Sequence, residues 1–355
     1  MNHTQQLFFE LIRVALGTQE QLSVTPTDQE WDDIFKQSQK QTIVGVCFSG
    51  LESLPAQQRP YSDLVVSWYA YHGKTEKMSR LLDERTDKVL TFFRSNGFQA
   101  VILKGQGIAQ LYPNPLRRVS GDIDVWLDGG RKRIYDFARK FDKEGKLYGV
   151  TYHHIHFSLF EDTEVEVHVY PSYMNNPFLN HRLHQFFKHY PPSNDSMTPS
   201  LAFNRIFILL HCFQHLTGHG VGLRQVMDYF YVLRQGFTEE EKRETVDWLE
   251  KLHLLAFAGA MMWLQKEIFG LEEKYLLVAP NEKEGRFMLE EICQTGNMGH
   301  FDKRNWGSTK TPFSRFLFNI RRDAHFVLHY PQEVLWQPFF NIYVYFWRLL
   351  KGLNE

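Results

Sequence analysis

Apolar residues recur at helical spacing through the first part of the chain. Residues 5–16 carry one apolar face, and residues 61–95 carry another that ends at Asn96-Gly97, a typical C-terminal cap. Residues 1–96 are therefore predicted to form an N-terminal helical region. Further predictions for this region are a helix capped near Thr27 that holds Trp31, Ile34 and Phe35, a helix over residues 42–54, and an apolar stripe of Met78, Leu82, Val89 and Phe93.

Short extended runs replace this pattern between residues 97 and 190. The apolar run 100–103 predicts a buried strand, and alternation over residues 122–127 predicts a strand with one buried face. Strands interspersed with helices indicate a mixed sheet, so the expected fold class is α+β, a small mixed-sheet core between two helical regions. The other predicted elements are a turn at 104–107, helices at 108–111 and 131–141, and strands at 155–160 and 164–170 joined by a hairpin loop at 161–163.

Helical periodicity returns in the last part of the chain. Residues 191–199 are rich in Pro and Ser and predict a linker. The expected domains are thus 1–96, 97–190 and 191–355. Predicted helices begin at residue 201 and continue over 246–255, 256–269, 284–295 and, after a polar segment at 296–312, over 313–353 with a break at Tyr330-Pro331.

Composition narrows the class of protein. The 355 residues carry a formal net charge of −1, which argues against binding of long nucleic acid but leaves an RNA end such as that of tRNA open. Three cysteines without a Cys-x-x-Cys pair argue against a disulfide framework and a structural zinc. Neither a signal-peptide pattern nor a membrane-length apolar run occurs. We therefore expect a soluble cytoplasmic protein with no membrane contact.

Acidic residues alternate with apolar ones in two of the predicted strands. Asp122 and Asp124 share one face of the first strand, and Glu164, Glu166 and His168 share one face of the other. If these strands are neighbours, three carboxylates converge. Carboxylates at that distance repel unless a cation lies between them, and oxygen ligands suit Mg²⁺ or Mn²⁺. This pattern indicates phosphoryl or nucleotidyl transfer.

Several short motifs together resemble a known family. They are Leu103-Lys104-Gly105, Tyr112-Pro113, Arg118, Gly121-Asp122-Ile123-Asp124-Val125 and Glu166-Val167-His168, followed on a predicted helix by His211, His215, Arg224 and Asp228. The set resembles the uncharacterised nucleotidyltransferase family of the DNA polymerase beta-type superfamily, from about Trp31 onward. The resemblance implies metal-dependent transfer of a nucleoside monophosphate from a nucleoside triphosphate, with release of pyrophosphate. It leaves the acceptor, which can be a small molecule, a protein or an RNA end, and the oligomeric state open.

The carboxylates are the expected catalytic and metal-binding residues. Asp122 and Asp124 are expected to bind the metal, and Glu166 is expected to be the third ligand and to take or orient the proton of the attacking hydroxyl. Glu164 lies on the same face and is the alternative. The family pattern, with an acidic residue two positions before the histidine, favours Glu166.

A second group of residues is expected to contact the nucleotide. Lys104 and the backbone amides of residues 105–107 suit the triphosphate, because glycine lets the main chain approach oxygen atoms and a helix N-terminus favours anions. Gln106 departs from the superfamily, which usually has Ser or Gly there. Arg118 either reaches a phosphate, orients Asp122 or is a surface arginine in an ordinary ion pair. The complete expected set is Lys104, Gly105, Gln106, Gly107, Arg118, His168, His211, His215, Arg224 and Asp228.

Histidines recur in two segments. His211, His215 and His219 are four residues apart, which predicts a polar helix face along the cleft; a zinc site is the alternative. The histidines of residues 153–156 are interpreted as part of a strand beside the site and not as ligands. A different functional hypothesis is a nucleotide-binding regulatory module with weak or no turnover, which Gln106 would favour. A third is a helical interaction scaffold that binds no nucleotide.

Overall fold

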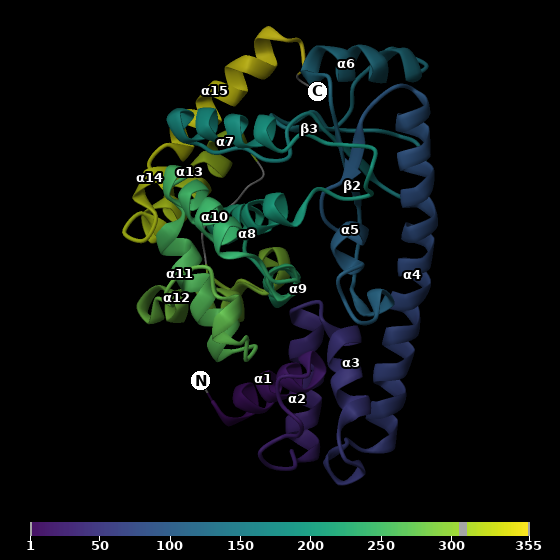
Figure 1. The fold of residues 1–355 in the computed structure, drawn as a ribbon, viewed down its shortest axis with the longest axis vertical. Helices are drawn as coiled ribbons and strands as arrows, with labels where there is room; N and C mark the ends of the chain where they lie inside the picture. Colours follow the sequence, from purple (N-terminus) through teal and green to yellow (C-terminus); the bar gives the residue numbers. More distant parts are fainter. Residues whose placement is uncertain (1, 305–310, 354–355) are drawn as a thin grey trace.

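The computed structural model describes residues 2–304 and 311–353. Four helices form the N-terminal region, and the longest of them extends from this bundle along the side of the sheet (Figure 1). Thr27 and Glu30 form a capping box at the predicted helix start, and Asn96 caps the long helix where expected. The helices are α1 (His3–Leu16), α2 (Asp28–Lys40), α3 (Val44–Ser53) and α4 (Ser62–Ser95).

The buried stripe of α4 differs from the prediction at one position. The other three predicted residues are buried, whereas Met78 is 47% exposed. The buried residue on this turn is Ser79, whose backbone carbonyl accepts a hydrogen bond from Gln106 at 3.2 Å. This turn of α4 therefore makes a polar contact and not an apolar one.

A four-stranded mixed sheet of order β1-β2-β4-β3 forms the middle of the chain, which confirms the predicted α+β class. β2 and β4 are parallel neighbours at its centre, and each outer strand is antiparallel to its neighbour. The strand predicted at 155–160 is shorter in the structure, where it covers His154–His156. In the connection that follows it, Asp162 forms an ion pair with Arg85 of α4 at 2.9 Å. The elements are β1 (Ala100–Ile102), α5 (Gln106–Ala109), β2 (Ile123–Leu127), α6 (Gly130–Phe141), β3 (His154–His156) and β4 (Val165–His168).

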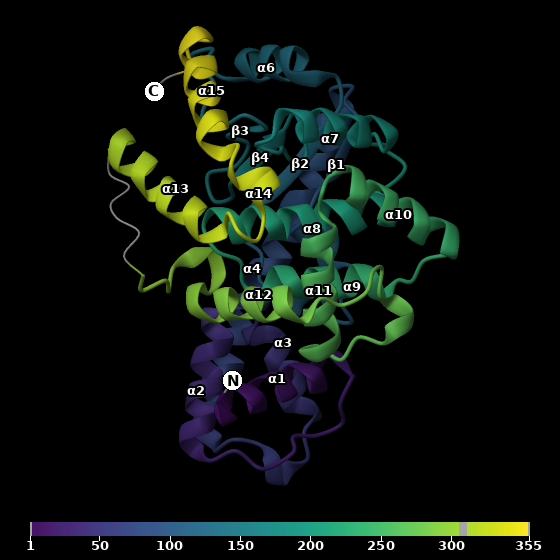
Figure 2. The same ribbon diagram turned by 90° about the vertical axis from the view of Figure 1, so that its left-hand side faces the viewer.

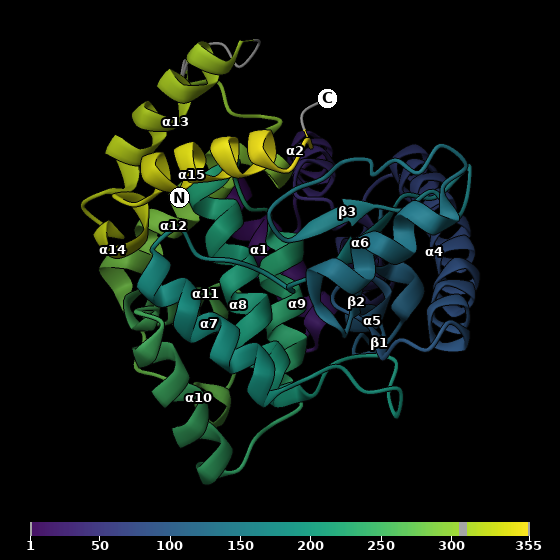
Figure 3. The same cartoon turned by 90° about the horizontal axis from the view of Figure 1, so that it is seen from above.

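The two faces of the sheet have different neighbours. Ile123, Val125 and Val167 belong to a core that also contains residues of α4 and α6. Figure 3 shows the ribbons of these two helices beside the strands. Trp126 points to the opposite face, where it stacks on Phe203 of a C-terminal helix. Because side chains alternate along a strand, the acidic residues of β2 and β4 share this second face. The candidate site therefore lies between the sheet and the C-terminal helices.

The C-terminal helices differ from the prediction in three main ways. The helix predicted to hold His211, His215, Arg224 and Asp228 is broken into two between Gly218 and Leu223. α7 was not predicted; Asn176 and Pro177 are its N-cap and first residue. α10 begins at Glu239, before the predicted residue 246, since Thr238 and Glu241 form a capping box. The helices are α7 (Pro177–His189), α8 (Leu201–Gly218), α9 (Leu223–Arg234), α10 (Glu239–Lys251), α11 (Leu255–Glu267), α12 (Glu282–Thr295), α13 (Pro312–Phe326), α14 (Pro331–Val334) and α15 (Gln337–Leu350), with 3-10 turns at Ala56–Gln58, Pro115–Arg117, Glu273–Tyr275 and Asn297–Gly299.

The predicted linker covers the outer edge of β1. The backbone N–H of Ile102 donates to the carbonyl of Met197 at 2.8 Å, and that of Ala100 donates to Asn194 Oδ1 at 2.9 Å. These contacts satisfy backbone groups that an edge strand would otherwise expose. One apolar core runs from the N-terminal helices into the C-terminal helices, so the three-domain division stays a prediction.

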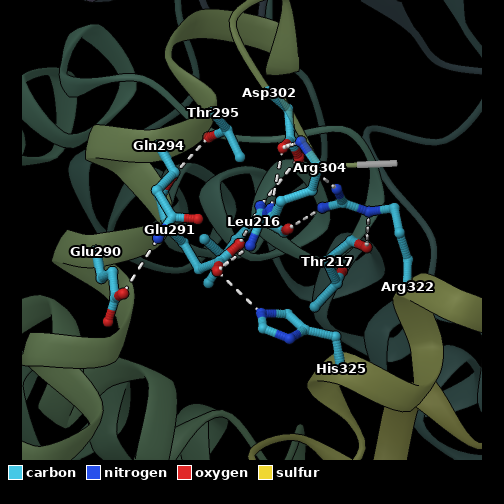
Figure 4. A network of polar contacts seen from close by, with 10 residues as sticks. All are labelled: Leu216, Thr217, Glu290, Glu291, Gln294, Thr295, Asp302, Arg304, Arg322 and His325. Atoms are coloured by element: carbon cyan, nitrogen blue, oxygen red, sulfur yellow. Dashed lines mark hydrogen bonds and ion pairs between the residues drawn. The ribbon is translucent and has the colours of Figure 1, made fainter. Parts of the chain in front are cut away.

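A network of charged side chains attaches α13 to α8 and α12 (Figure 4). Arg304 donates two hydrogen bonds to Glu291, at 2.6 and 2.9 Å, and His325 lies 2.9 Å from the same carboxylate. Arg322 is buried and donates to the carbonyl of Leu216 at 2.9 Å, one of the last carbonyls of α8. Part of the predicted polar segment, residues 305–310, lies outside the described residues. None of the helices described is long and apolar enough to cross a membrane.

Candidate functional site

Three of the predicted site residues meet on the helix-covered face of the sheet. Asp124 on β2 pairs in register with Glu166 on the parallel strand β4. One ligand atom each from Asp124, Glu166 and His168 lies within 4.8 Å of the others. Asp122 comes just before β2 and is partly exposed, and its carboxylate lies 4.0 Å from Lys104 Nζ. The structure thus brings Asp124, Glu166 and His168 together, with Asp122 beside them.

Asp124 is the buried centre of this group. Its side chain is 1% exposed, and its Oδ1 lies 2.9 Å from His168 Nε2 and 3.2 Å from Lys104 Nζ. Its Oδ2 is also buried but has no hydrogen-bond partner among the described residues. A buried carboxylate oxygen without a donor is energetically costly. This oxygen therefore fits the role of a cation ligand.

Two protein cations supply positive charge between the carboxylates. Burial acts to lower the pKa of Lys104, but Asp124 and Asp122 outweigh it and raise that pKa. Burial likewise opposes protonation of His168, but its contacts with Asp124 and Glu166 raise its pKa to about 9. Burial acts to raise the pKa of Glu166, yet its neighbours His168, His154 and Lys104 lower it to about 2. Lys104 and His168 thus relieve the repulsion between the acids, so this repulsion alone does not indicate a metal. The unpartnered Asp124 Oδ2 is the better indication of a metal ligand.

Glu164 and Glu166 have different surroundings. Glu166 Oε2 lies 3.5 Å from His168 Nε2 and its side chain is mostly buried. Glu164 is more exposed, and its Oε1 lies 3.0 Å from His156 Nδ1. The geometry therefore places Glu166, and not the alternative Glu164, beside Asp124.

The Lys-Gly turn places the backbone near the carboxylates but directs one side chain away. Gly105 has φ 55° and ψ −121°, a conformation that suits glycine, and it caps the short helix α5. Gln106, an expected nucleotide-binding residue, is buried against α4, where its Nε2 donates to Asp83 at 2.5 Å. A Cβ on Gly107 would lie 2.8 Å from Thr198, so this glycine permits close packing of the linker.

Arg118 and Asp228 form a buried ion pair. Arg118 donates from Nε and Nη2 to the two carboxylate oxygens, both at 2.7 Å, and Tyr112 donates to Asp228 Oδ1 at 2.7 Å. The guanidinium also donates to Ser120 at 2.6 Å. Arg118 is 5% exposed, so the surface-arginine alternative is wrong. This ion pair joins the segment before β2 to α9. The charged groups of both residues are therefore occupied by contacts within the protein.

Arg224 lies close to this pair but has a different environment. Its Nη1 donates to the carbonyl of Val119 at 2.9 Å, while its Nε is buried without a hydrogen-bond partner in the described chain. Burial and the neighbouring Arg118 lower the pKa of Arg224, although Asp228 and Asp122 act in the opposite direction. Such a cation is suited to an anion that enters the site.

The histidines of α8 form a polar patch near Lys104. The ring centroids of His211 and His215 are 4.3 Å apart. Burial lowers the pKa of His215 to about 3. His219 follows the last residue of α8. These three residues form no candidate metal group within residues 2–304 and 311–353. They fit the predicted polar face better than the zinc alternative.

Two histidines of β3 lie on a strand beside the site, as interpreted from the sequence, and both approach Glu166. His154 Nδ1 is 3.2 Å from Glu166 Oε2, and His156 Nε2 is 3.8 Å from Glu166 Oε1. The signal in the sequence was the alternation of these residues on a strand next to Glu166. Tyr112 is part of the Tyr112-Pro113 motif, but its contact with Asp228 and that of Ser120 with Arg118 had no such signal.

The mixed sheet, the Lys-Gly turn after β1 and the acids of β2 and β4 define an α+β protein with a carboxylate centre. A family model described as an uncharacterised nucleotidyltransferase matches residues 27–270. The chain therefore belongs to this nucleotidyltransferase family, as its motifs indicated. Comparison with curated proteins gives no match, and neither does comparison with solved structures. The matched residues include every candidate site residue and end before α12.

Proposed function

We propose that this protein transfers a nucleoside monophosphate from a nucleoside triphosphate to an acceptor and releases pyrophosphate. The observation that carries the proposal is the buried Asp124 carboxylate, which is paired in register with Glu166 and has an unpartnered Oδ2 among the described residues. Membership of the family supports the reaction class. The acceptor is a small molecule, a protein side chain or an RNA end, and the reaction takes place in the cytoplasm.

Mg²⁺ or Mn²⁺ is the cofactor that this donor set fits. Asp122, Asp124 and Glu166 would hold it, because hard cations prefer carboxylate oxygens and share their remaining positions with phosphates. When bound, the ion would neutralise charge on the phosphates. Glu166 has a pKa lowered to about 2 and is therefore ionised at neutral pH. Its carboxylate can thus bind the metal ion or accept a hydrogen bond that orients the attacking hydroxyl.

The cations of the site suit the triphosphate. Lys104 lies between Asp122 and Asp124 and can exchange these contacts for phosphate oxygens. Arg224 provides a second cation, and the Gly105 turn provides backbone N–H groups. The acceptor oxygen attacks the α-phosphorus, the bond from this phosphorus to the bridging oxygen breaks, and pyrophosphate leaves with the electron pair. The hydroxyl proton passes to solvent.

Labelled nucleoside triphosphates incubated with the protein and cell extract test the reaction. We expect pyrophosphate release and a labelled product with the wild type and with Asp136→Asn, a control on α6 whose carboxylate pairs with Lys132 at the surface. Asp124→Asn is expected to lose both signals. Equal turnover by Asp124→Asn and wild type would refute the proposal.

A nucleotide-binding regulatory module is the second candidate. The burial of Gln106 against α4 favours it, because no side chain at position 106 then reaches the phosphates. Calorimetry with the four nucleoside triphosphates and Mg²⁺, run beside the pyrophosphate assay, separates the two candidates. Binding without pyrophosphate release, with every acceptor class offered, would favour the module.

A further inference from the structure

Two histidines and one carboxylate gather at the β3 edge of the sheet. β3 pairs with β4 so that His156 lies opposite Glu166. Ligand atoms of His154, His156 and Glu166 lie within 4.8 Å of one another. His154 Nδ1 and His156 Nε2 approach different oxygens of the Glu166 carboxylate, at 3.2 and 3.8 Å. These separations are similar to those between ligand atoms around one tetrahedral ion.

Glu164 supplies a second indication. Its Oε1 lies 3.0 Å from His156 Nδ1, while the other ring nitrogen of His156 faces Glu166. Histidines that bind a metal through one ring nitrogen usually donate the other N–H to a carboxylate, which fixes the ring and its tautomer. His154 Nδ1 is buried and has no well-oriented hydrogen bond in the described chain despite its proximity to Glu166. Each ring therefore has one nitrogen atom directed toward the Glu166 carboxylate.

We propose that His154, His156 and Glu166 bind one zinc-like divalent cation at this edge of the sheet. Imidazole nitrogens favour this class of ion over Mg²⁺. Three protein ligands leave one tetrahedral position for water or a substrate atom, and the partly exposed His156 gives access from solvent. Glu166 is shared with the Asp124 centre, but binding of this ion does not depend on nucleotide transfer.

Titration of the full chain with Co²⁺ tests the site, because tetrahedral Co²⁺ absorbs visible light. We expect one strongly absorbing ion per chain, displaced by Zn²⁺, in the wild type and in His189→Ala, which changes an exposed histidine on α7. His156→Ala should lose the absorption, and its ring is exposed enough that the fold is unaffected. Glu164→Gln should weaken binding about 10- to 100-fold.

The two centres can be tested separately. Asp124→Asn should retain the Co²⁺ absorption while it loses pyrophosphate release. Co²⁺ binding without any nucleotide transfer by the wild type would refute the proposed function and support the zinc-like site. An absence of Co²⁺ absorption, or absorption unchanged by His156→Ala, would refute the zinc-like site.

An independent feature lies at the C-terminal end, where α13 and α15 contact each other at one side of the molecule (Figure 2). The inner face of α15 packs through Phe340 and Trp347 on Tyr152, with ring centroids 5.2 and 6.2 Å apart. The outer faces of both helices expose large apolar side chains at helical spacing. They are Phe313, Phe316, Leu317 and Ile320 on α13, and Phe339, Ile342, Phe346, Leu349 and Leu350 on α15.

The exposed charged residues of this segment, within the part of it that the structure describes, are basic. Within the described residues 311–353, Arg315, Arg321 and Lys351 are exposed, whereas the two acids, Asp323 and Glu333, are buried. Helices with an aromatic apolar face flanked by cations are typical of proteins that lie on membrane surfaces. Two copies of this face in contact would bring like charges together, so an anionic bilayer is the better match.

We infer that the outer face of α13 and α15 binds the surface of an anionic phospholipid bilayer. α15 lies in the plane of the interface with its outer side chains among the lipids, while its inner face holds it to the protein. This inference departs from the sequence-based expectation of no membrane contact, and the experiment below decides between them.

Sedimentation with vesicles of phosphatidylcholine and phosphatidylglycerol (3:1) tests this surface. We expect the wild type to sediment with these vesicles, less so at high salt or with phosphatidylcholine alone. Phe339→Ser/Phe346→Ser should abolish binding, and Tyr69→Ser, an exposed aromatic residue on α4, should not change it. Absence of binding to the anionic vesicles would refute the inference. So would a dimer in ultracentrifugation that the double substitution dissociates.

Discussion

Asp124 on β2 lies opposite Glu166 on β4, although 41 residues separate them in the chain, because the two strands are parallel neighbours in register. His168, two residues beyond Glu166, reaches back to Asp124 Oδ1 at 2.9 Å. The pairing therefore brings the carboxylates of Asp124 and Glu166 and the protonated imidazole of His168 into one group. Lys104 completes this group from the turn after β1.

Asp124→Asn should reduce pyrophosphate release by about 10²-fold or more, since one charged group at the reacting centre is lost. It should also lower the pKa of His168 from about 9, because Asp124 is a principal cause of that raised value. Steady-state kinetics measure the first effect and NMR titration of the imidazole measures the second. Asp136→Asn is the matched control, and a His168 pKa that stays near 9 would contradict the assigned contact.

Asp228→Asn should destabilise the protein by about 3–5 kcal/mol, because it leaves Arg118 buried without its counter-ion. The exposed pair Lys132–Asp136 offers the control, and its disruption should change the free energy of unfolding far less, because solvent screens both charges. Urea denaturation gives both free energies of unfolding. A loss of activity with unchanged stability would instead indicate that Asp228 contacts the nucleotide.

The sequence predicted the acidic centre because alternation on short strands is a local property. The prediction that Asp124 and Glu166 meet needed only one further assumption, that their strands are neighbours. By contrast, the partners of Arg118 and Gln106 depend on how helices pack. Asp228 is 110 residues from Arg118, and nothing local distinguishes a buried arginine from a surface one. The helix α7 was missed although it begins with an Asn N-cap and a Pro at its first position, which is a local start signal.

Gly105→Ala should destabilise the protein by about 1–3 kcal/mol, because an L residue is strained at φ 55° and ψ −121°. The new Cβ itself has room, since its nearest neighbour would be the Asp122 carbonyl oxygen at 3.5 Å. Gly73→Ala is the contrasting control. It lies within α4 with no atom near the added Cβ and should stabilise by about 0.5–1 kcal/mol. Thermal unfolding of both variants checks this difference in sign.

Glu333 on α14 should make stability fall as pH rises. Burial raises its pKa to about 8, although the backbone N–H groups of Asn175 and Asn176 act in the opposite direction. The native state therefore keeps a proton that the unfolded chain releases near pH 4.5. The stability from this group is full below pH 4.5 and is lost as pH rises through about 8. Glu333→Gln should reduce this slope, measured by urea unfolding between pH 5 and 8.5, and an unchanged slope would contradict the raised pKa.

Lys104→Met should have opposite effects on two measured quantities. Without nucleotide, the ammonium lies 3.2 Å from Asp124 and 4.0 Å from Asp122 and competes with a divalent cation for both. Its removal should therefore tighten binding of Mn²⁺ to the free protein by about tenfold, since like charges in one site oppose each other. With nucleotide present, the same change removes a cation from the triphosphate and should lower pyrophosphate release. Electron paramagnetic resonance of Mn²⁺ and the pyrophosphate assay report the two effects, with Lys104→Arg as the charge-retaining control. Weaker Mn²⁺ binding by Lys104→Met would mean that the lysine organises the carboxylates and does not compete for them.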